Sequence, residues 1–327
     1  MEDLEVPKHD GTATGNGRAK ISRRDVKLKK IGEGISGCID LYQSRLTLDT
    51  YVVKTYHCRE KYETKTEYQK RVLHEYNILR GLHNVHVIEV YKDEVSWFGS
   101  TVRVYMEAGA ADLSKILKGK KSEARNKKEM LCLWKQLCYG IDYLHNTAKI
   151  CHRDLKLDNL VFDSHTGMLK IIDLATAFEF SRNPDTGVYG DQEYEAIGLV
   201  GSDSYIAPET VARFRYDGKK ADIWSVGIIL FNMLNAKFPW KSARLSDRKY
   251  VAYCNRDGNK DSSELGFATI SDCLPPESHD LVTKLLEVDS LKRAGISDCF
   301  KDVWFNNIGV CDDSTCGLDH STLVKGV

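Results

Sequence analysis

The chain has 327 residues, of which 42% are hydrophobic and 29% charged, enough to bury the core of one large domain or of two lobes. Lysine plus arginine and aspartate plus glutamate each number 47, so the formal net charge is zero. A nucleic acid as the main partner normally demands a basic excess, and we therefore expect no nucleic-acid partner.

The sequence also gives little indication of a transmembrane helix, of disulfides or of a cysteine-bound metal site. No apolar run approaches the roughly 20 residues of a spanning helix, and the N-terminus Met1-Glu2-Asp3 is no apolar signal core. We therefore expect a cytoplasmic protein without a transmembrane segment. The ten cysteines contain no Cys-x-x-Cys pair, so we expect reduced thiols, most of them buried, and no structural metal site.

Strands dominate the predicted elements of the first third of the chain. Residues 1–24 are polar and lack apolar periodicity, which predicts a disordered segment. The elements expected after it are strands at 28–31, 38–44 and 51–56, a charged helix at 65–80, and strands at 87–97 and 100–106.

Helices dominate from about residue 112 onward. Apolar side chains recur at helical spacing at 130–145 and 222–234, and shorter helices are expected at 278–286 and 297–304. A small strand-rich part before a larger helical part predicts an α+β fold of two lobes with a cleft between them. The expected boundaries are an N-lobe at about 25–107, a C-lobe at about 108–305 and a tail at 306–327.

Three glycines, Gly32, Gly34 and Gly37, lie between the first two predicted strands. Because glycine lets the backbone turn tightly, main-chain N–H groups there can approach phosphate oxygens closely. The residues that follow, from Ile39 to Tyr42, are typical of a strand. This favours a hairpin over phosphates and disfavours the strand-to-helix turn of a dinucleotide site.

Lys54 ends the third predicted strand, directly after Val52 and Val53. An isolated lysine at a strand end is normally solvated. Here Glu75 lies near the apolar side of the following helix and offers a carboxylate partner, so we expect Lys54 to point inward as a positive charge for phosphate groups.

The strongest chemical signal is the run from His152 to Asn159, followed by an apolar strand and Asp173. Asp154 can orient a hydroxyl group and accept its proton, and Lys156 can balance charge on a phosphoryl group. Asn159 and Asp173 offer oxygen ligands of the kind that Mg²⁺ prefers. Together these residues predict a site for phosphoryl transfer.

These motifs, in this order, resemble the eukaryotic protein kinase family over roughly residues 28–305. The match continues with Ala207-Pro208-Glu209, with Asp222-Ile223-Trp224, and with Arg293, which in the family pairs with that glutamate. The resemblance implies a bilobal kinase fold, ATP and Mg²⁺ as cofactors and proteins as substrates. Lys156, two residues after the catalytic aspartate, is typical of the serine/threonine type.

Finer features are similar to the fungal halotolerance and nitrogen-permease-reactivator kinases. They include the segment from Gly201 to Ile206, Phe238-Pro239-Trp240-Lys241, and the helical segment from Glu67 to Ile78. This similarity implies regulation of nutrient and cation transporters, by a monomeric catalytic unit that associates peripherally with transporter-regulating complexes.

The resemblance also implies a role for each site residue. Ser202 would support Asp154 by hydrogen bonding, and Met106 would be the gatekeeper of the adenine pocket. The implied catalytic residues are Asp154, Lys156, Asn159, Lys54 and Glu75, with Asn159 and Asp173 as the metal ligands. The implied nucleotide-binding residues are Ile31, Gly32, Gly34, Gly37, Ile39, Val52, Lys54, Met106, Glu107, Ala108, Asp112, Val161 and Asp173.

Three positions depart from the family pattern. Asp173-Leu174-Ala175 replaces the usual Asp-Phe-Gly, and a flip of alanine to positive φ would cost roughly 1 kcal/mol more than one of glycine, so we expect a biased switch. Val52 replaces the usual alanine and would either tighten the adenine pocket or displace the nucleotide. Cys38 in the glycine-rich hairpin is expected to be an inert thiol, with oxidation as the alternative.

The activation segment before Ser202 lacks the usual phosphorylatable residue. In the family, Arg153 would normally be neutralised by a phosphate on that residue. The acids Asp191, Glu193 and Glu195 either replace the phosphate or belong to a solvated loop. We predict activity without phosphorylation of this segment.

Substrate preference is partly readable. Asp112 and Asp158 stand where basophilic members of the family place acids against substrate arginines, although Asp112 can instead bind ribose. The basic stretch 118–128 between two helices is either a solvated loop or a dock for an acidic partner or headgroup.

The sequence as a whole predicts an active serine/threonine protein kinase. A pseudokinase scaffold that binds partners without catalysis is the alternative, supported only by Ala175 and Val52. A small-molecule kinase of similar fold is disfavoured by Ala207-Pro208-Glu209 and the segment before it, which build a groove for protein substrates.

Overall fold

The computed structural model describes residues 21–34, 37–96, 101–118, 120–121, 125–163, 168–255 and 270–311. Most of the segment predicted to be disordered and most of the predicted tail lie outside these residues. The chain divides into two compact units. The first runs to Lys65 and adds Tyr91–Ala108, and the second holds Thr66–Val90 and continues from Gly109.

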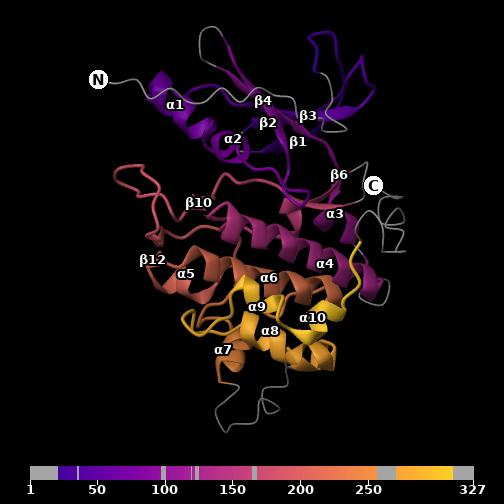
Figure 1. The fold of residues 1–327 in the computed structure, drawn as a ribbon, viewed down its shortest axis with the longest axis vertical. Coiled ribbons are helices and arrows are strands. Elements are labelled where there is room, and N and C mark those ends of the chain that lie inside the picture. The colour runs from indigo at the N-terminus through magenta and orange to yellow at the C-terminus, as the bar shows by residue number, and fades with distance from the viewer. Residues whose placement is uncertain are drawn as a thin grey trace. The chain divides into compact units, whose positions relative to one another are not determined.

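A five-stranded sheet with the order β1-β2-β3-β5-β4 forms the first unit (Figure 1). Its strands are β1 (Val26–Gly34), β2 (Gly37–Gln43), β3 (Thr50–Tyr56), β4 (Val90–Val95) and β5 (Val102–Glu107). All five strands expected from the sequence are present, and only their ends differ, by at most three residues.

Tyr51 and Val53 of β3 form the centre of a core on one face of this sheet. The ring of Tyr51 stacks on Tyr42, with centroids 5.7 Å apart, and lies 6.2 Å from the ring of Tyr105. Its hydroxyl donates a hydrogen bond to Asp25 at 3.0 Å. Burial and this bond raise the pKa of Tyr51. The bond also attaches Asp25, which precedes β1, to the sheet.

Helices form most of the second unit (Figure 1). They are α1 (Lys65–Val72, whose first residue closes the first unit), α2 (His74–Leu79), α3 (Leu113–Leu117), α4 (Lys127–Asp142), α5 (Pro208–Ala212), α6 (Gly218–Asn235), α7 (Arg248–Cys254), α8 (His279–Leu285), α9 (Ile296–Cys299) and α10 (Val303–Asn307). The predicted α+β class is confirmed, since a strand-rich unit precedes a larger helical unit.

The core of the second unit is centred on α6. Asp217 starts this helix by accepting hydrogen bonds from the backbone N–H groups of Lys219 and Lys220, and its apolar side chains are buried on every side, as expected of a central helix. Trp134 of α4 is fully buried and donates its indole N–H to the carbonyl of Val226 at 3.0 Å. The two long helices predicted from periodicity therefore form the scaffold that carries the site.

Short strands connect this scaffold to its loops. One sheet has the order β6-β8-β9, and two further pairs are β7 with β10 and β11 with β12. Their bounds are β6 (Gly109–Asp112), β7 (Ile150–Cys151), β8 (Leu160–Asp163), β9 (Leu169–Ile171), β10 (Phe178–Glu179), β11 (Ala196–Ile197) and β12 (Arg215–Tyr216). Of these, only the apolar strand before Asp173 was expected.

Two helices expected as continuous are each divided. The helix predicted at 65–80 consists of α1 and α2, which meet at Leu73. The helix predicted at 297–304 consists of α9 and α10, because Asp302 caps α10 by accepting a hydrogen bond from the N–H of Phe305 at 2.9 Å and so starts a new helix. Residues just after 305 are attached to α4, since Lys135 Nζ donates to the carbonyl of Ile308 at 2.8 Å.

None of the nine cysteines in the described part of the chain forms a disulfide, and four of them are buried, fewer than we expected. The described residues contain no group of three or more side chains suited to hold a metal ion. None of the helices described here combines the length and the apolarity needed to span a bilayer.

Candidate active site

Asp154 lies in the loop after β7, and each of its carboxylate oxygens has its own partner. The Ser202 hydroxyl donates to Oδ1 at 3.0 Å, as expected from the sequence, and Lys156 Nζ donates to Oδ2 at 2.6 Å. Lys156 Nζ also donates to Ser202 Oγ at 3.2 Å. The carboxylate is thus fixed in one orientation, while 15% of its side chain stays exposed and can be approached by a substrate.

Asn159 lies at the end of a short 3₁₀ turn that follows Lys156. Its side-chain N–H donates to the backbone carbonyl of Asp154 at 2.9 Å, and the residue is only 4% exposed. Because the amide NH₂ group is used in this way, the amide oxygen remains to act as a ligand. The backbone carbonyl of Asn159 accepts from the N–H of Ile172 at 3.0 Å, which holds the start of the next segment beside it.

Asp173 follows Ile172 and has a φ of 63°, a conformation that residues other than glycine rarely adopt. Such strain persists only where neighbouring contacts maintain it, and it is concentrated at functional sites. Among the residues that the structure describes, its half-buried carboxylate makes no hydrogen bond and no ion pair. The carboxylate of Asp173 and the amide oxygen of Asn159 are donors that fit a hard cation such as Mg²⁺, and the backbone bond between Ile172 and Asn159 connects their two segments.

His152 connects the two segments. Its Nε2 lies 3.0 Å from the carbonyl of Ile172, and its Nδ1 lies 3.2 Å from the backbone nitrogen of Asp154. Since the carbonyl can only accept and the N–H can only donate, the ring carries its proton on Nε2. The imidazole thereby holds the backbone of residues 154 and 172 at a fixed separation.

A buried carboxylate, that of Asp222 in α6, holds the start of the loop. It accepts hydrogen bonds from the backbone N–H groups of His152 at 2.7 Å and Arg153 at 2.8 Å, and His145 Nε2 lies 2.9 Å from it. These bonds maintain the unusual φ of 71° at Arg153. The sequence motif contained Asp222, but no role was assigned to it. An acid inside an apolar helix was the available signal, because a buried carboxylate requires donors.

The guanidinium of Arg153 has neutral partners. It donates to the carbonyl of Ile197 at 2.7 Å and to the hydroxyl of Tyr216 at 3.1 Å, so β11 and β12 both contribute an acceptor. Glu193, one of the acids considered for this position, pairs with Lys219 instead. Within the described residues, the hypothesis that an acid takes the place of a phosphate beside Arg153 is therefore wrong.

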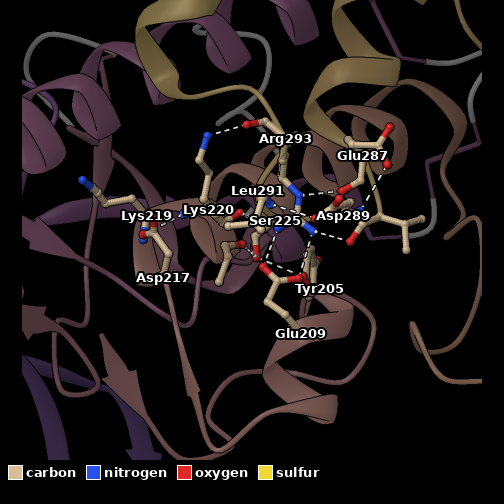
Figure 2. A network of polar contacts seen from close by, with 12 residues as sticks. Tyr205, Glu209, Asp217, Lys219, Lys220, Ser225, Glu287, Asp289, Leu291 and Arg293 are labelled. Carbon is tan, nitrogen blue, oxygen red and sulfur yellow. Dashed lines mark hydrogen bonds and ion pairs between the residues drawn. The ribbon is translucent and has the colours of Figure 1, made fainter. Parts of the chain in front are cut away.

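A buried ion pair anchors the segment that follows Ser202. Arg293 and Glu209 form the expected bidentate pair, with one N–H···O distance of 2.9 Å and side chains that are at most 4% exposed. Figure 2 shows the guanidinium of Arg293 among Glu209, Lys220 and Glu287. The backbone carbonyls of Lys220 and Glu287 each accept a hydrogen bond from it at 2.8 Å. Ser225 Oγ adds a bond of 2.9 Å to the carbonyl of Tyr205, so α6 holds this segment directly at Tyr205 and, through Arg293, at Glu209.

The predicted nucleotide-binding residues of the first unit lie on adjacent strands. Ile39 pairs with Lys54 between β2 and β3, and Val52 pairs with Met106 between β3 and β5. Lys54 is 8% exposed, with Nζ 5.0 Å from the centre of the Tyr56 ring. The others are Ile31, Gly32 and Gly34 in β1, Gly37 in β2, Glu107 in β5 and Ala108 directly after it.

Gly37 is sterically required. A Cβ at this position would lie 2.2 Å from the carbonyl oxygen of Thr55, so only glycine allows β2 to approach β3 here. The neighbouring Cys38 directs its thiol toward the carboxylate of Glu33, 3.6 Å away, where it acts as a weak donor. Lys30 lies beside the same two side chains, so a basic as well as an acidic group adjoins this thiol, and its inertness stays a prediction.

The remaining predicted residues belong to the second unit. Glu75 is a buried residue of α2, and Asp112 pairs with Val161 between β6 and β8. The structure thus brings Asp154, Lys156 and Asn159 together in the second unit, and it pairs Ile39 with Lys54 and Val52 with Met106 in the first. The pairing of Lys54 with Glu75, and the use of both groups by one nucleotide, remain predictions.

Ala175 does not need the conformation that alanine disfavours. Positive φ values occur at Asp173 but not at Ala175, so this conformation contains no penalty for replacing glycine. The buried Leu174 remains an apolar side chain where the family has phenylalanine. The observed backbone therefore offers no support for an inactive site.

Asp112 is engaged in its own helix. It caps α3 by accepting from the N–H of Lys115 at 2.9 Å, and it also pairs with Lys115 Nζ and accepts from the Ser114 hydroxyl. Burial alone would raise the pKa of the Asp112 carboxyl, but these bonds outweigh it and leave the pKa below its ordinary value. Asp158 shares the same Ser114 hydroxyl at 2.9 Å.

Comparison with known proteins gives matches over most of the chain. The model of the family described as protein kinase domain matches residues 26–305. The serine/threonine-protein kinase PRR2 of Saccharomyces cerevisiae is 32% identical over 305 residues, which are 86% of this chain and 42% of the relative.

Two further relatives from the same organism belong to the subgroup named in the sequence analysis. The nitrogen permease reactivator protein is 29% identical over 343 residues, covering 94% of this chain and 42% of the relative. The serine/threonine-protein kinase HAL4/SAT4 is 25% identical over 326 residues, covering 95% and 51%. The chain spans about half the length of the curated relatives it matches, and both resemblances inferred from the sequence are confirmed.

Proposed function

The chain belongs to the protein kinase domain family, and from this premise we propose that it is a serine/threonine protein kinase that transfers the γ-phosphate of ATP to hydroxyl groups of proteins. One observation carries the proposal. The partly exposed carboxylate of Asp154 is held by Ser202 and lies beside the ammonium group of Lys156, within a loop that also positions Asn159. This is the arrangement that orients a nucleophile and offsets charge on a phosphoryl group.

Asp154 would orient the attacking hydroxyl and accept its proton. Because Ser202 already fixes one oxygen of the carboxylate, no reorientation is needed when a substrate arrives. Lys156 is held 2.6 Å from the same carboxylate, where its positive charge would offset the negative charge that develops on the transferred group.

Asn159 and Asp173 would hold Mg²⁺, which, when bound, stabilises charge on the phosphate oxygens. In the first unit, the buried Lys54 would contact the α- and β-phosphates, supported by Glu75. The backbone of Glu107 and Ala108 would hydrogen-bond adenine, with Ile39, Val52 and Val161 as its apolar contacts and Met106 as gatekeeper.

Phosphate transfer from ATP to a generic basic protein tests this proposal. The purified chain is compared with Asp154→Asn, which keeps the size of the side chain but removes its charge, and with Lys54→Met. We expect Asp154→Asn to lower the transfer rate at least 100-fold while ATP still binds. A wild-type chain that binds ATP without transferring phosphate would contradict the proposal and support a scaffold.

We further propose that the substrates include regulators of nutrient or ion transporters, reached by peripheral association from the cytoplasm. The support is similarity to a relative whose name is nitrogen permease reactivator protein. Phosphoproteomics after acute inhibition of the chain provides the test. Loss of phosphosites on proteins that control transporters is expected, and a response confined to other classes of protein would contradict this proposal.

A preference for arginine upstream of the phosphorylated residue rests on Asp112 and Asp158. Since Asp112 is already engaged by Lys115, we expect Asp158 to contribute more of the preference. Peptide arrays with and without upstream arginine measure it, and equal phosphorylation of both sets would end this proposal.

A further inference from the structure

A groove of about 660 Å³ in the second unit borders the proposed catalytic residues. Its lining includes Leu157 and Asp158 of the catalytic loop and the segment 202–205. Because the hydroxyl of Ser202 in this lining donates directly to Asp154, the groove lies next to the carboxylate at which a substrate hydroxyl would react.

Three lysines, Lys118, Lys120 and Lys121, line this groove, and we refer to them as the lysine wall. Within the described part of the chain, none of their ammonium groups has an ion pair or hydrogen bond. The lining contains two acids, of which Asp203 pairs with Arg244 at 3.0 Å, while Asp158 accepts a hydrogen bond from the neutral Ser114 hydroxyl and keeps its charge. Because four basic side chains stand against these two acids, the lining as a whole carries a positive charge.

Arg125 fixes the segment that carries the lysine wall. Its guanidinium donates to the carbonyls of Asn232 at 2.6 Å and Met233 at 3.0 Å near the end of α6, and to that of Leu117 at 3.3 Å at the end of α3. A further bond of 3.2 Å reaches the carbonyl of Lys120. Carbonyls at helix ends can accept such bonds from outside the helix, and burial lowers the pKa of Arg125.

This anchoring decides between the two interpretations of the basic stretch. A purely solvated loop needs neither lysines in the lining of a groove nor a partly buried arginine bound to two helices, and this segment has both. With Arg125 bound to two helix ends, the lysines are held at the groove before any partner arrives, which reduces the entropy lost on binding.

A second hollow of about 370 Å³ shares Ser204 and Phe238 with the first and continues its charge. Its lining includes the exposed Lys241 and Arg248. The acid there, Asp247, is occupied by the backbone N–H of Lys241 at 2.8 Å and by the start of α7. The linings of both hollows therefore contain more basic than acidic side chains.

We propose that this groove binds an acidic segment of the protein substrate, with aspartate or glutamate side chains facing the lysine wall. The apolar Leu117, Tyr205 and Phe238 in the same lining suit a polypeptide better than a nucleic acid or a headgroup. That the occupant is a substrate rests on the proposed function.

Peptide binding tests the groove without requiring catalysis. Three fluorescent peptides share a central serine, and the residues that flank it are glutamates in the first, glutamines in the second and arginines in the third. The affinity of each peptide for the full chain is measured by fluorescence anisotropy. We expect the glutamate peptide to bind about 5-fold more tightly than the glutamine peptide. Lys118→Glu/Lys120→Glu/Lys121→Glu should remove this difference and favour the arginine peptide.

The matched control is Lys127→Glu/Lys128→Glu, which makes the same change at exposed lysines of α4 outside the groove lining. It should leave all three affinities unchanged. Thermal unfolding checks that each variant is folded, and a glutamine version of the triple variant replaces the glutamate version should that one fail to fold. Equal affinity of the wild-type chain for the glutamate and glutamine peptides overturns the inference.

Phosphorylation of the same peptides separates this inference from the proposed function. A KM for the glutamate peptide about 5-fold below that for the glutamine peptide, with similar kcat, supports both. Charge-dependent binding without phosphate transfer supports the groove and contradicts the proposed function. Transfer with the same KM for both peptides supports the proposed function and contradicts the groove as a substrate site.

Discussion

The catalytic loop, residues 152–159, and the lysine wall border the same groove but use their polar groups in opposite ways. In the loop, Asp154 and Asn159 each form hydrogen bonds within the protein. In the wall, the backbone is held by Arg125 while the ammonium groups have no partner among the described residues. The groups proposed for catalysis are oriented in advance, and the groups proposed to recognise a partner are positioned but kept available.

We expect the largest effect on stability and activity from removing the buried carboxylate of Asp222, which holds the start of the catalytic loop. Asp222→Ala leaves the N–H groups of His152 and Arg153 and the ring of His145 without their acceptor, which should lower the free energy of unfolding by about 4 kcal/mol. Transfer activity should fall at least 100-fold, because small displacements of a catalytic group have effects of that size. Urea unfolding and kcat measure the two effects.

The matched control for this change is Asp280→Ala, since Asp280 forms an exposed pair with Lys284. It should change the free energy of unfolding by less than about 0.5 kcal/mol. Asp222→Ala with a stability within that range would show that the loop does not depend on α6.

The second largest effect is expected from breaking the ion pair between Arg293 and Glu209, which anchors the segment after Ser202. Arg293→Met leaves the carboxylate of Glu209 buried without a partner, which should destabilise the protein by about 3 kcal/mol. The pair Arg293→Met/Glu209→Leu should recover part of this loss, because no uncompensated charge remains. Both values come from urea unfolding, and a double variant less stable than the single one would contradict the explanation.

The neutral environment of Arg153 predicts independence from phosphorylation. Its guanidinium is already occupied by the carbonyl of Ile197 and the hydroxyl of Tyr216, so phosphatase treatment should leave the transfer rate within about 2-fold. Tyr216→Phe should cost about 1 kcal/mol of stability and leave that insensitivity unchanged. Activity that disappears after phosphatase treatment would contradict this prediction.

The smallest effect concerns Asp247, which holds the basic lining of the second hollow. Burial would raise the pKa of its carboxyl, but backbone N–H groups of Lys241, Tyr250, Ser242 and Lys249 lower the pKa overall. A carboxyl whose pKa is lower in the folded state stabilises the fold above its unfolded pKa of about 4 and loses that contribution as the pH falls through the folded value. Asp247→Ala should therefore cost about 1 kcal/mol at pH 7, and the difference from wild type should shrink toward pH 3.

Local sequence patterns predicted the parts of the site that are close together in the chain. Asp154, Lys156 and Asn159 lie within six residues, so a single loop brings them together. Contacts between distant residues were not accessible in the same way. Arg125 reaches Asn232 across 107 positions, and no local pattern indicates that pairing.

The fold shows the same limit. The long helix α6 and the strands of the first sheet have enough residues to establish a period, and the sequence predicted them. Strands β11 and β12 have two residues each, too few for a period, although they supply the partners of Arg153. For such contacts between distant residues, the remaining signal in the sequence is a charged residue within an apolar helix, such as Asp222.

The binding of ATP with and without Mg²⁺, measured by isothermal titration calorimetry, tests the proposed metal ligands Asn159 and Asp173 most directly. Wild type and Asp154→Asn should both bind ATP about 10-fold more tightly when Mg²⁺ is present. Asp173→Asn, which removes the carboxylate that has no partner among the described residues, should bind ATP equally with and without the metal. Retention of the full Mg²⁺ effect in Asp173→Asn would contradict the site described for this chain.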